Sequence, residues 1–208
     1  MAITYPRDLP DETSIARVTF RAASAVAAYT SPYTFRTQRQ ARTGFVWGGE
    51  VSTIPLTAAK AALWSAWITS MNGQENTFYM GDMGQQTAQG EAGGTPLVNG
   101  ASQTGTSLII DGCTISQTAW LKAGDYFSLG SSTSKRLYKC LEDADTDAGG
   151  NVTLNIWPNL RSSPANNDAL DITNPRTTCI LTENTAEWSK AGDHFTRLSF
   201  EYVEALTS

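Results

Sequence analysis

The residues that could carry out chemistry are few and scattered. The chain has one histidine, His194, which follows Gly192 and Asp193 at the start of an expected strand. A Ser–His–Asp or Cys–His site needs a nucleophile in a defined local context, and the sequence contains no G-x-S-x-G elbow and no catalytic cysteine motif. A single histidine at a strand start is typical of a structural residue. The sequence therefore predicts that the protein is not an enzyme, and it indicates no cofactor.

An acidic loop is the second candidate site. Asp143, Asp145 and Asp147 alternate with small residues, as at the start of a calcium-binding loop. The following glycine is displaced by one position, and Leu154 stands where a bidentate glutamate would complete the coordination. We therefore expect a solvated hairpin loop and predict no metal site, although the sequence leaves open whether the three aspartates hold a cation.

The cysteines and the apolar segments indicate where the protein is made. Cys113, Cys140 and Cys179 are far apart and form no C-x-x-C pair, so zinc and iron–sulfur sites lack their usual spacing. We expect each cysteine to be a small buried hydrophobic residue, and we expect the protein to be synthesised in a reducing compartment. No signal-peptide pattern opens the chain, and no run of about eighteen apolar residues occurs, so we expect neither signal-peptide export nor membrane insertion.

Charge argues against specific nucleic-acid binding. Fifteen basic and twenty acidic residues give a formal net charge of −5, the opposite sign from the usual nucleic-acid footprint. The densest basic stretch carries Arg36, Arg39 and Arg42 without interleaved aromatic residues, which favours a solvated strand edge or a subunit contact. Only 17% of the residues are charged, so we expect part of the surface to be covered by another protein.

The elements that position these residues are mainly strands. Alternation of period two predicts strands at 15–22 and 45–51, with a bulge at Gly48-Gly49, and residues 77–82 form another short strand. Residues 29–35 contain a proline and predict a turn or an edge strand. One helix is expected at about 58–71, capped by Thr57 and ended by Asn72-Gly73. Its buried face should hold Leu63, Trp64, Trp67, Ile68 and Met71.

The middle of the chain predicts a separate module. Residues 84–94 and 166–170 are polar and read as linkers, and residues 95–165 contain short strands at 108–110, 126–129, 136–141 and 152–157, with a turn at Asp111-Gly112. Strands resume at 177–181, 187–189 and 194–203. They are natural partners for the open sheet edges of the first segment. We therefore predict a mainly β fold. It comprises a discontinuous β-sandwich body, residues 1–83 and 171–208, and an inserted small β-barrel or β-sandwich.

Several segments, taken in order, resemble one protein family. They are residues 15–20 (IARVTF), 31–35 (SPYTF), 64–67 (WSAW), 77–82 (TFYMGD), 120–126 (WLKAGDY), 156–161 (IWPNLR) and 200–204 (FEYVE). Together they resemble the distal tail proteins, also called minor tail or tail hub proteins, of long-tailed non-contractile bacteriophages and related prophages. The segments around residues 122–126 and 157–161 are the most specific.

The resemblance implies a structural protein of the virion. Members of this family have a β-sandwich with a flanking helix, related to the tail-tube subunit, and close into a hexameric ring that joins the tube to the tip or baseplate. The implied partners are further copies of the chain, the tail tube protein, the tape measure protein and the tip, hub or baseplate proteins. The implied location is the distal end of the phage tail, after synthesis in the bacterial cytoplasm.

Two other functions remain open. The inserted module could bind a sugar on the host surface by stacking Trp120, Tyr126, Tyr138 and Trp157 on a pyranose ring, although aromatic residues in a small barrel more often form its core. A hydrolase of cell wall or polysaccharide has the least support. If DNA passes through the ring, its lumen should be neutral or acidic, so the arginines at 36–42 should not line it unpaired.

Overall fold

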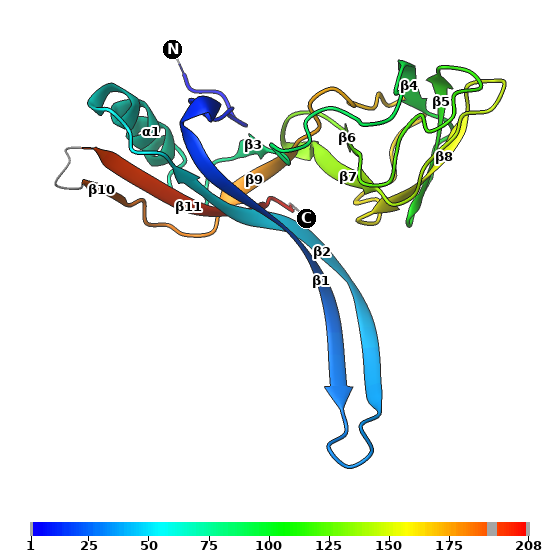
Figure 1. Cartoon of the computed structure of the whole chain (residues 1–208), viewed down its shortest axis with the longest axis horizontal. Helices are drawn as coiled ribbons and strands as arrows, with labels where there is room; N and C mark the ends of the chain where they lie inside the picture. The colour runs from blue at the N-terminus through cyan, green and yellow to red at the C-terminus, as the bar shows by residue number, and fades with distance from the viewer. Residues whose placement is uncertain (1, 191–194, 207–208) are drawn as a thin grey trace.

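The structure is a computed structural model of the chain, and it describes residues 2–190 and 195–206. The predicted mainly β fold with one flanking helix is confirmed. The strands form two antiparallel sheets, one of six strands and one of five (Figure 1). Within the described residues, no helix is long and apolar enough to cross a membrane.

The six-stranded sheet, here called the body sheet, is built from both ends of the chain. Its order is β1-β2-β11-β9-β3, and β10 pairs with β11 beside β9. The C-terminal strands thus complete the edges that the N-terminal strands would leave open. The bounds are β1 Ile15–Thr30, β2 Thr37–Thr53, β3 Phe78–Met80, β9 Thr177–Leu181, β10 Trp188–Lys190 and β11 Thr196–Glu204.

One helix, α1 (Ala58–Ser70), packs on the body sheet, and a short 3-10 helix, η1 (Glu12–Ser14), precedes β1. Trp64, Trp67, Ile68 and Met71 are buried, as predicted from their spacing. The prediction for Leu63 is wrong, because this side chain is 57% exposed. At 100° per residue, Leu63 lies about 40° beyond Trp67 and about 140° from Ile68, so it falls at the edge of the buried stripe and stays exposed.

The five-stranded sheet, here called the module sheet, contains the middle of the chain in the order β4-β5-β8-β7-β6. Its core is a single cluster that includes Trp120, Phe127 and Tyr138. All three cysteines of the chain are free and buried, as expected. The bounds are β4 Gly94–Val98, β5 Ser107–Cys113, β6 Tyr126–Leu129, η2 Ser132–Ser134, β7 Arg136–Cys140 and β8 Val152–Trp157. That the two sheets are separate domains stays a prediction.

Two glycine predictions are wrong. Gly48 and Gly49 form no bulge, since the pairing of β1 with β2 runs through them without a register shift. A Cβ on Gly49 would lie 1.8 Å from the carbonyl oxygen of Thr19, so this glycine allows two strands to approach closely. Asp111-Gly112 is no turn but part of β5, where Gly112 takes a φ of +71°.

The module is joined to the body by an aromatic cluster and a buried ion pair. Trp47 of β2, Tyr126 of β6 and Leu137 of β7 form one small core, and the indole Nε1 of Trp47 donates to the carbonyl of Leu137 at 2.9 Å. Nearby, Arg161 contacts the carboxylate of Glu204 at 2.6 Å. Residues of both sheets therefore share buried contacts at this junction.

Candidate functional site

The outer part of the β1–β2 hairpin, residues 24–45, is the feature of the molecule that stands out most from the two sheets, and it is here called the arm. The strand β11 pairs with β2 only between Gly48 and Ser52, so beyond Gly48 the structure describes no third strand paired with β1 and β2. Figure 1 shows the arm leaving the body and extending away from both sheets. The arm is therefore a free two-stranded ribbon.

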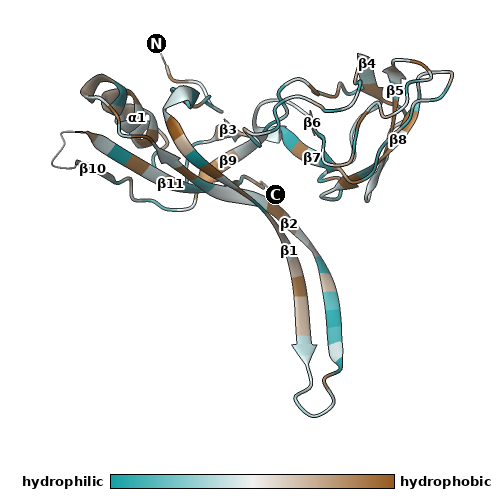
Figure 2. Ribbon diagram, viewed as in Figure 1, coloured by the Kyte–Doolittle hydropathy of each residue, from teal (hydrophilic) through white to brown (hydrophobic). Residues whose placement is uncertain are grey.

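An irregularity in the pairing of β1 with β2 marks where the arm begins. The register is continuous up to the pair Ser24 and Phe45, and resumes at the pair Val26 and Ala41. One residue of β1 thus faces three residues of β2, an irregularity of the kind that bends a strand pair. Outside this point, the β1 side is mostly alanine and valine and the β2 side is mostly glutamine and arginine, so Figure 2 colours the outer part of β1 as more hydrophobic than that of β2.

The tip of the arm is an ordered turn that displays aromatic rings. The backbone N–H of Ser31 donates to the carbonyl of Arg36 at 3.0 Å, and the N–H of Phe35 donates to the carbonyl of Ser31 at 2.9 Å. Phe35 takes a φ of +54°, a left-handed conformation that is uncommon for an aromatic residue. Tyr33 is 91% exposed and Phe35 81% exposed, so both rings face solvent.

The arm carries charge of one sign. Between residues 13 and 49 the sequence has five arginines and no lysine, aspartate or glutamate, in a protein whose net charge is −5. Arg36, Arg39 and Arg42 are exposed. In the parts of the chain that the structure covers, none of these three forms an ion pair. The arm is thus a cationic, partly aromatic protrusion whose charges have no acidic partner within the described chain.

An isolated two-stranded hairpin is marginally stable in water, and its edges offer unpaired backbone groups to other chains. The arm has no buried core of its own, because from Arg21 to Gly44 every residue whose exposure is described is exposed, apart from the half-buried Ser31. Such a ribbon offers protein–protein contact by charge, aromatic burial and strand-edge pairing. We take the arm as the candidate functional site.

The four aromatic residues predicted to stack on a sugar do not form one open surface. Trp120 and Tyr138 are buried in the module core, where Trp120 donates to the carbonyl of Gly93 at 2.9 Å. Tyr126 is also buried, and Trp157 is half-buried beside it along a shallow depression. A stacking platform needs a free ring face, and burial leaves none on Trp120 or Tyr138.

The acidic loop uses its carboxylates within the fold. Asp143 accepts from the backbone N–H of residue 123 at 2.8 Å, and Asp145 accepts from that of residue 119 at 2.6 Å. Asp147 accepts from two backbone N–H groups and from the side chain of Asn151, and these hydrogen bonds lower its pKa. Over residues 2–190 and 195–206, no group of three or more His, Cys, Asp or Glu side chains is placed to hold a metal ion. His194 lies outside the described residues.

Sequence comparison adds no family assignment. Neither a protein-family model nor a curated protein matches the chain. The arm was only partly anticipated from the sequence, which predicts strands at 15–22 and 45–51, a turn or edge strand at 29–35, and a solvated strand edge or subunit contact at 36–42, but no strand at 23–28. The absence of acidic residues from 13 to 49 is the signal that could have marked this stretch as a single unit.

Proposed function

We propose that the protein is a structural subunit of a bacteriophage tail tip, and that its arm links neighbouring copies into a hexameric ring between the tail tube and the tip or baseplate. The observation that carries the proposal is the arm itself, a cationic ribbon with exposed aromatic residues at its tip and no buried face. The two-sheet fold with one helix and the sequence resemblance to distal tail proteins support it.

The charge of the arm argues against direct contact between two arms. Two arms that met each other would bring cations against cations, which is unfavourable. The arm of one copy must therefore meet a different surface of the next copy, and such head-to-tail contacts produce a ring when the rotation closes. In this arrangement the two faces of the ring contact the tail tube and tape measure proteins on one side and the tip proteins on the other.

Shortening the arm tests the proposal. Residues 28–39 are replaced by Asn-Gly, a two-residue turn that suits an antiparallel hairpin and leaves the body part of β1 and β2 intact. Multi-angle light scattering across a concentration series should give assemblies for the natural chain and monomers for the shortened chain. The control variant is Leu141→Ser, which removes an exposed apolar residue from the module and should assemble normally.

Two results would contradict the proposal. One is equal assembly by the shortened and natural chains. The other is a natural chain that stays monomeric at all concentrations and also in the presence of the tail tube protein.

A further inference from the structure

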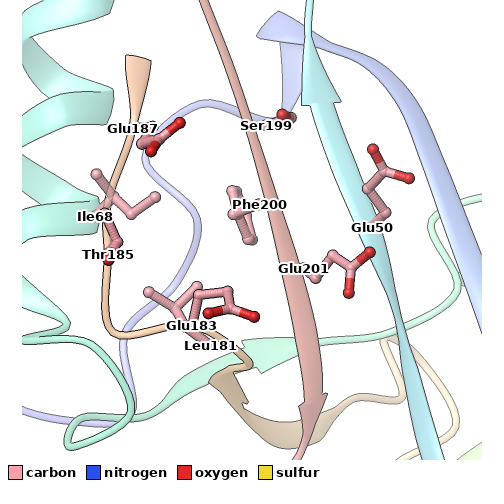
Figure 3. A pocket seen from close by; sticks show the side chains of 9 residues that line it. All are labelled: Glu50, Ile68, Leu181, Glu183, Thr185, Glu187, Ser199, Phe200 and Glu201. Carbon is pink, nitrogen blue, oxygen red and sulfur yellow. The ribbon is translucent and has the colours of Figure 1, made fainter.

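The body sheet has an opening beside β11. The strand β11 pairs with β10 at Thr196–Leu198 and with β9 from Tyr202 onward. Between these two pairings, the chain from Leu181 to Trp188 leaves the sheet and forms a loop. The result is an open groove with a cavity volume of about 500 Å³. Figure 3 shows Phe200 in the middle of this groove, with Ile68 of α1 and Leu181 to one side, so its floor is apolar.

The walls of the groove are acidic. Glu50, Glu183, Glu187 and Glu201 surround the floor, and they come from β2, the 182–187 loop and β11. Glu50 and Glu201 stand directly opposite each other in the β2–β11 pairing, where like charges are destabilising. Among the residues that the structure describes, none of the four glutamates forms an ion pair. Arg197 lies in an adjoining depression that shares Glu187 with the groove.

We propose that this groove receives the arm of a neighbouring copy of the same chain. The charges are complementary, since the arm carries three exposed arginines and no acidic residue, and the groove carries four glutamates. The apolar parts of the two surfaces also match. Tyr33 and Phe35 are exposed aromatic rings at the tip of the arm, and the floor of the groove is apolar.

The arm that enters the groove belongs to a second copy, because the arm of a chain cannot reach the groove of the same chain. Figure 1 shows the arm leaving the body on the side away from α1, β10 and the start of β11, where the groove lies. A separate protein with a basic segment is the alternative occupant, and the test below separates the two. The inference rests on the proposed function, for which it names the receiving surface. In this arrangement the arginines of the arm contact the glutamates of the groove, so they do not line a DNA channel without acidic partners.

Cysteine cross-linking between full-length copies tests the contact directly. The natural cysteines are buried, so introduced thiols can be modified selectively. One preparation carries Tyr33→Cys at the tip of the arm, and a second carries Thr185→Cys in the loop beside the groove, which leaves all four glutamates in place. A 1:1 mixture is treated with a short bis-maleimide. The control mixture pairs Tyr33→Cys with Ile115→Cys, an exposed position on the module.

We expect a covalent dimer at least about tenfold more abundant in the first mixture than in the control, and we expect it to decrease at 1 M salt, where the Debye length falls to about 3 Å. Charge reversal provides the second readout. Arg39→Glu with Arg42→Glu should prevent self-association, and so should Glu183→Arg with Glu187→Arg. A mixture of these two double variants should restore association, because the reversed arm then fits the reversed groove.

The outcomes separate this inference from the proposed function. Rings in electron micrographs without the cross-link would overturn the groove as the receiving surface and leave the ring intact. A cross-link within open chains that never close would support the groove and contradict the ring. Monomers that give no cross-link above the control would overturn the inference, as would a groove that binds a different basic protein and excludes the arm.

Discussion

The ion pair between Arg161 and Glu204 should be the most sensitive contact between the module and the body. Glu204 lies on β11, and its side chain is fully buried, whereas the side chain of Arg161 is 12% exposed. The carboxylate also accepts hydrogen bonds from the backbone N–H of Trp47 at 3.3 Å and from the hydroxyl of Thr177 at 3.2 Å. The substitution Arg161→Met would leave a buried carboxylate with only these two neutral donors.

The expected loss follows from this geometry. Breaking a buried ion pair by removing one partner costs about 3–5 kcal/mol, and the two remaining hydrogen bonds place Arg161→Met near the lower end, at about 3 kcal/mol. Adding Glu204→Gln removes the unpaired charge, so the double variant should recover about half of the loss. The control is Arg176→Met, which breaks the more exposed pair with Asp8 and the contact of the guanidinium with the Tyr79 ring, and it should cost about 1 kcal/mol.

Urea denaturation followed by tryptophan fluorescence measures these differences. With an m-value of about 2 kcal/mol/M, Arg161→Met should lower the midpoint by about 1.5 M. The reasoning is refuted if Arg161→Met and Arg176→Met are equally stable, or if adding Glu204→Gln makes Arg161→Met less stable still.

Three further predictions concern single groups. The carboxylate of Asp125 is buried and accepts from four N–H donors at 2.8–3.0 Å. Asp125→Ala should therefore lower the free energy of unfolding in urea by about 3 kcal/mol and speed amide exchange at Gln89 and Gly90. Unchanged exchange would show that this carboxylate does not hold the 84–94 linker. Burial raises the pKa of Asp171, but the hydrogen bond and charge of Lys135 outweigh it and hold that pKa below 3.8. The stability that Lys135→Met removes should therefore be present above pH 3.8 and be lost as pH falls further, and a difference from the natural chain that does not shrink as the pH is lowered below 3.8 would contradict this. Burial also raises the pKa of all three cysteine thiols, so a thiol reagent such as DTNB should label none of them in the folded chain and all three in urea, and fast labelling of the folded chain would contradict their burial.

Much of the fold could be predicted because local patterns and long-range packing agree. The helix was predicted almost to the residue, since Trp64, Trp67, Ile68 and Met71 have helical spacing and Asn72 and Gly73 both take positive φ at its end. The return of the C-terminal strands to the first sheet followed from the need to pair open edges.

The arm and the groove were harder to predict because both depend on pairing between strands, which the local sequence does not show. Residues 22–28 are mostly alanine, serine and valine, which have no strong strand alternation, so only pairing with residues 39–47 defines their register. The groove arises where the 182–187 loop, which connects β9 to β10, turns away from the neighbouring strand β11. Nothing in the local sequence indicates that Glu50 of β2 lies beside Glu201 of β11. The glycine errors have a related origin, because Gly49 lies against Thr19 of the paired strand β1 and Gly112 against Thr95 of the paired strand β4, and neither contact is visible in the local sequence.

Electron microscopy of the purified full-length chain at high concentration, alone and with the tail tube protein, tests the central claim most directly. The account predicts closed hexameric rings in which the density of each arm meets the body sheet of the next subunit, and antibody labelling of virions at the distal end of the tail. Particles that remain single subunits under both conditions, together with unlabelled tail tips, would contradict it.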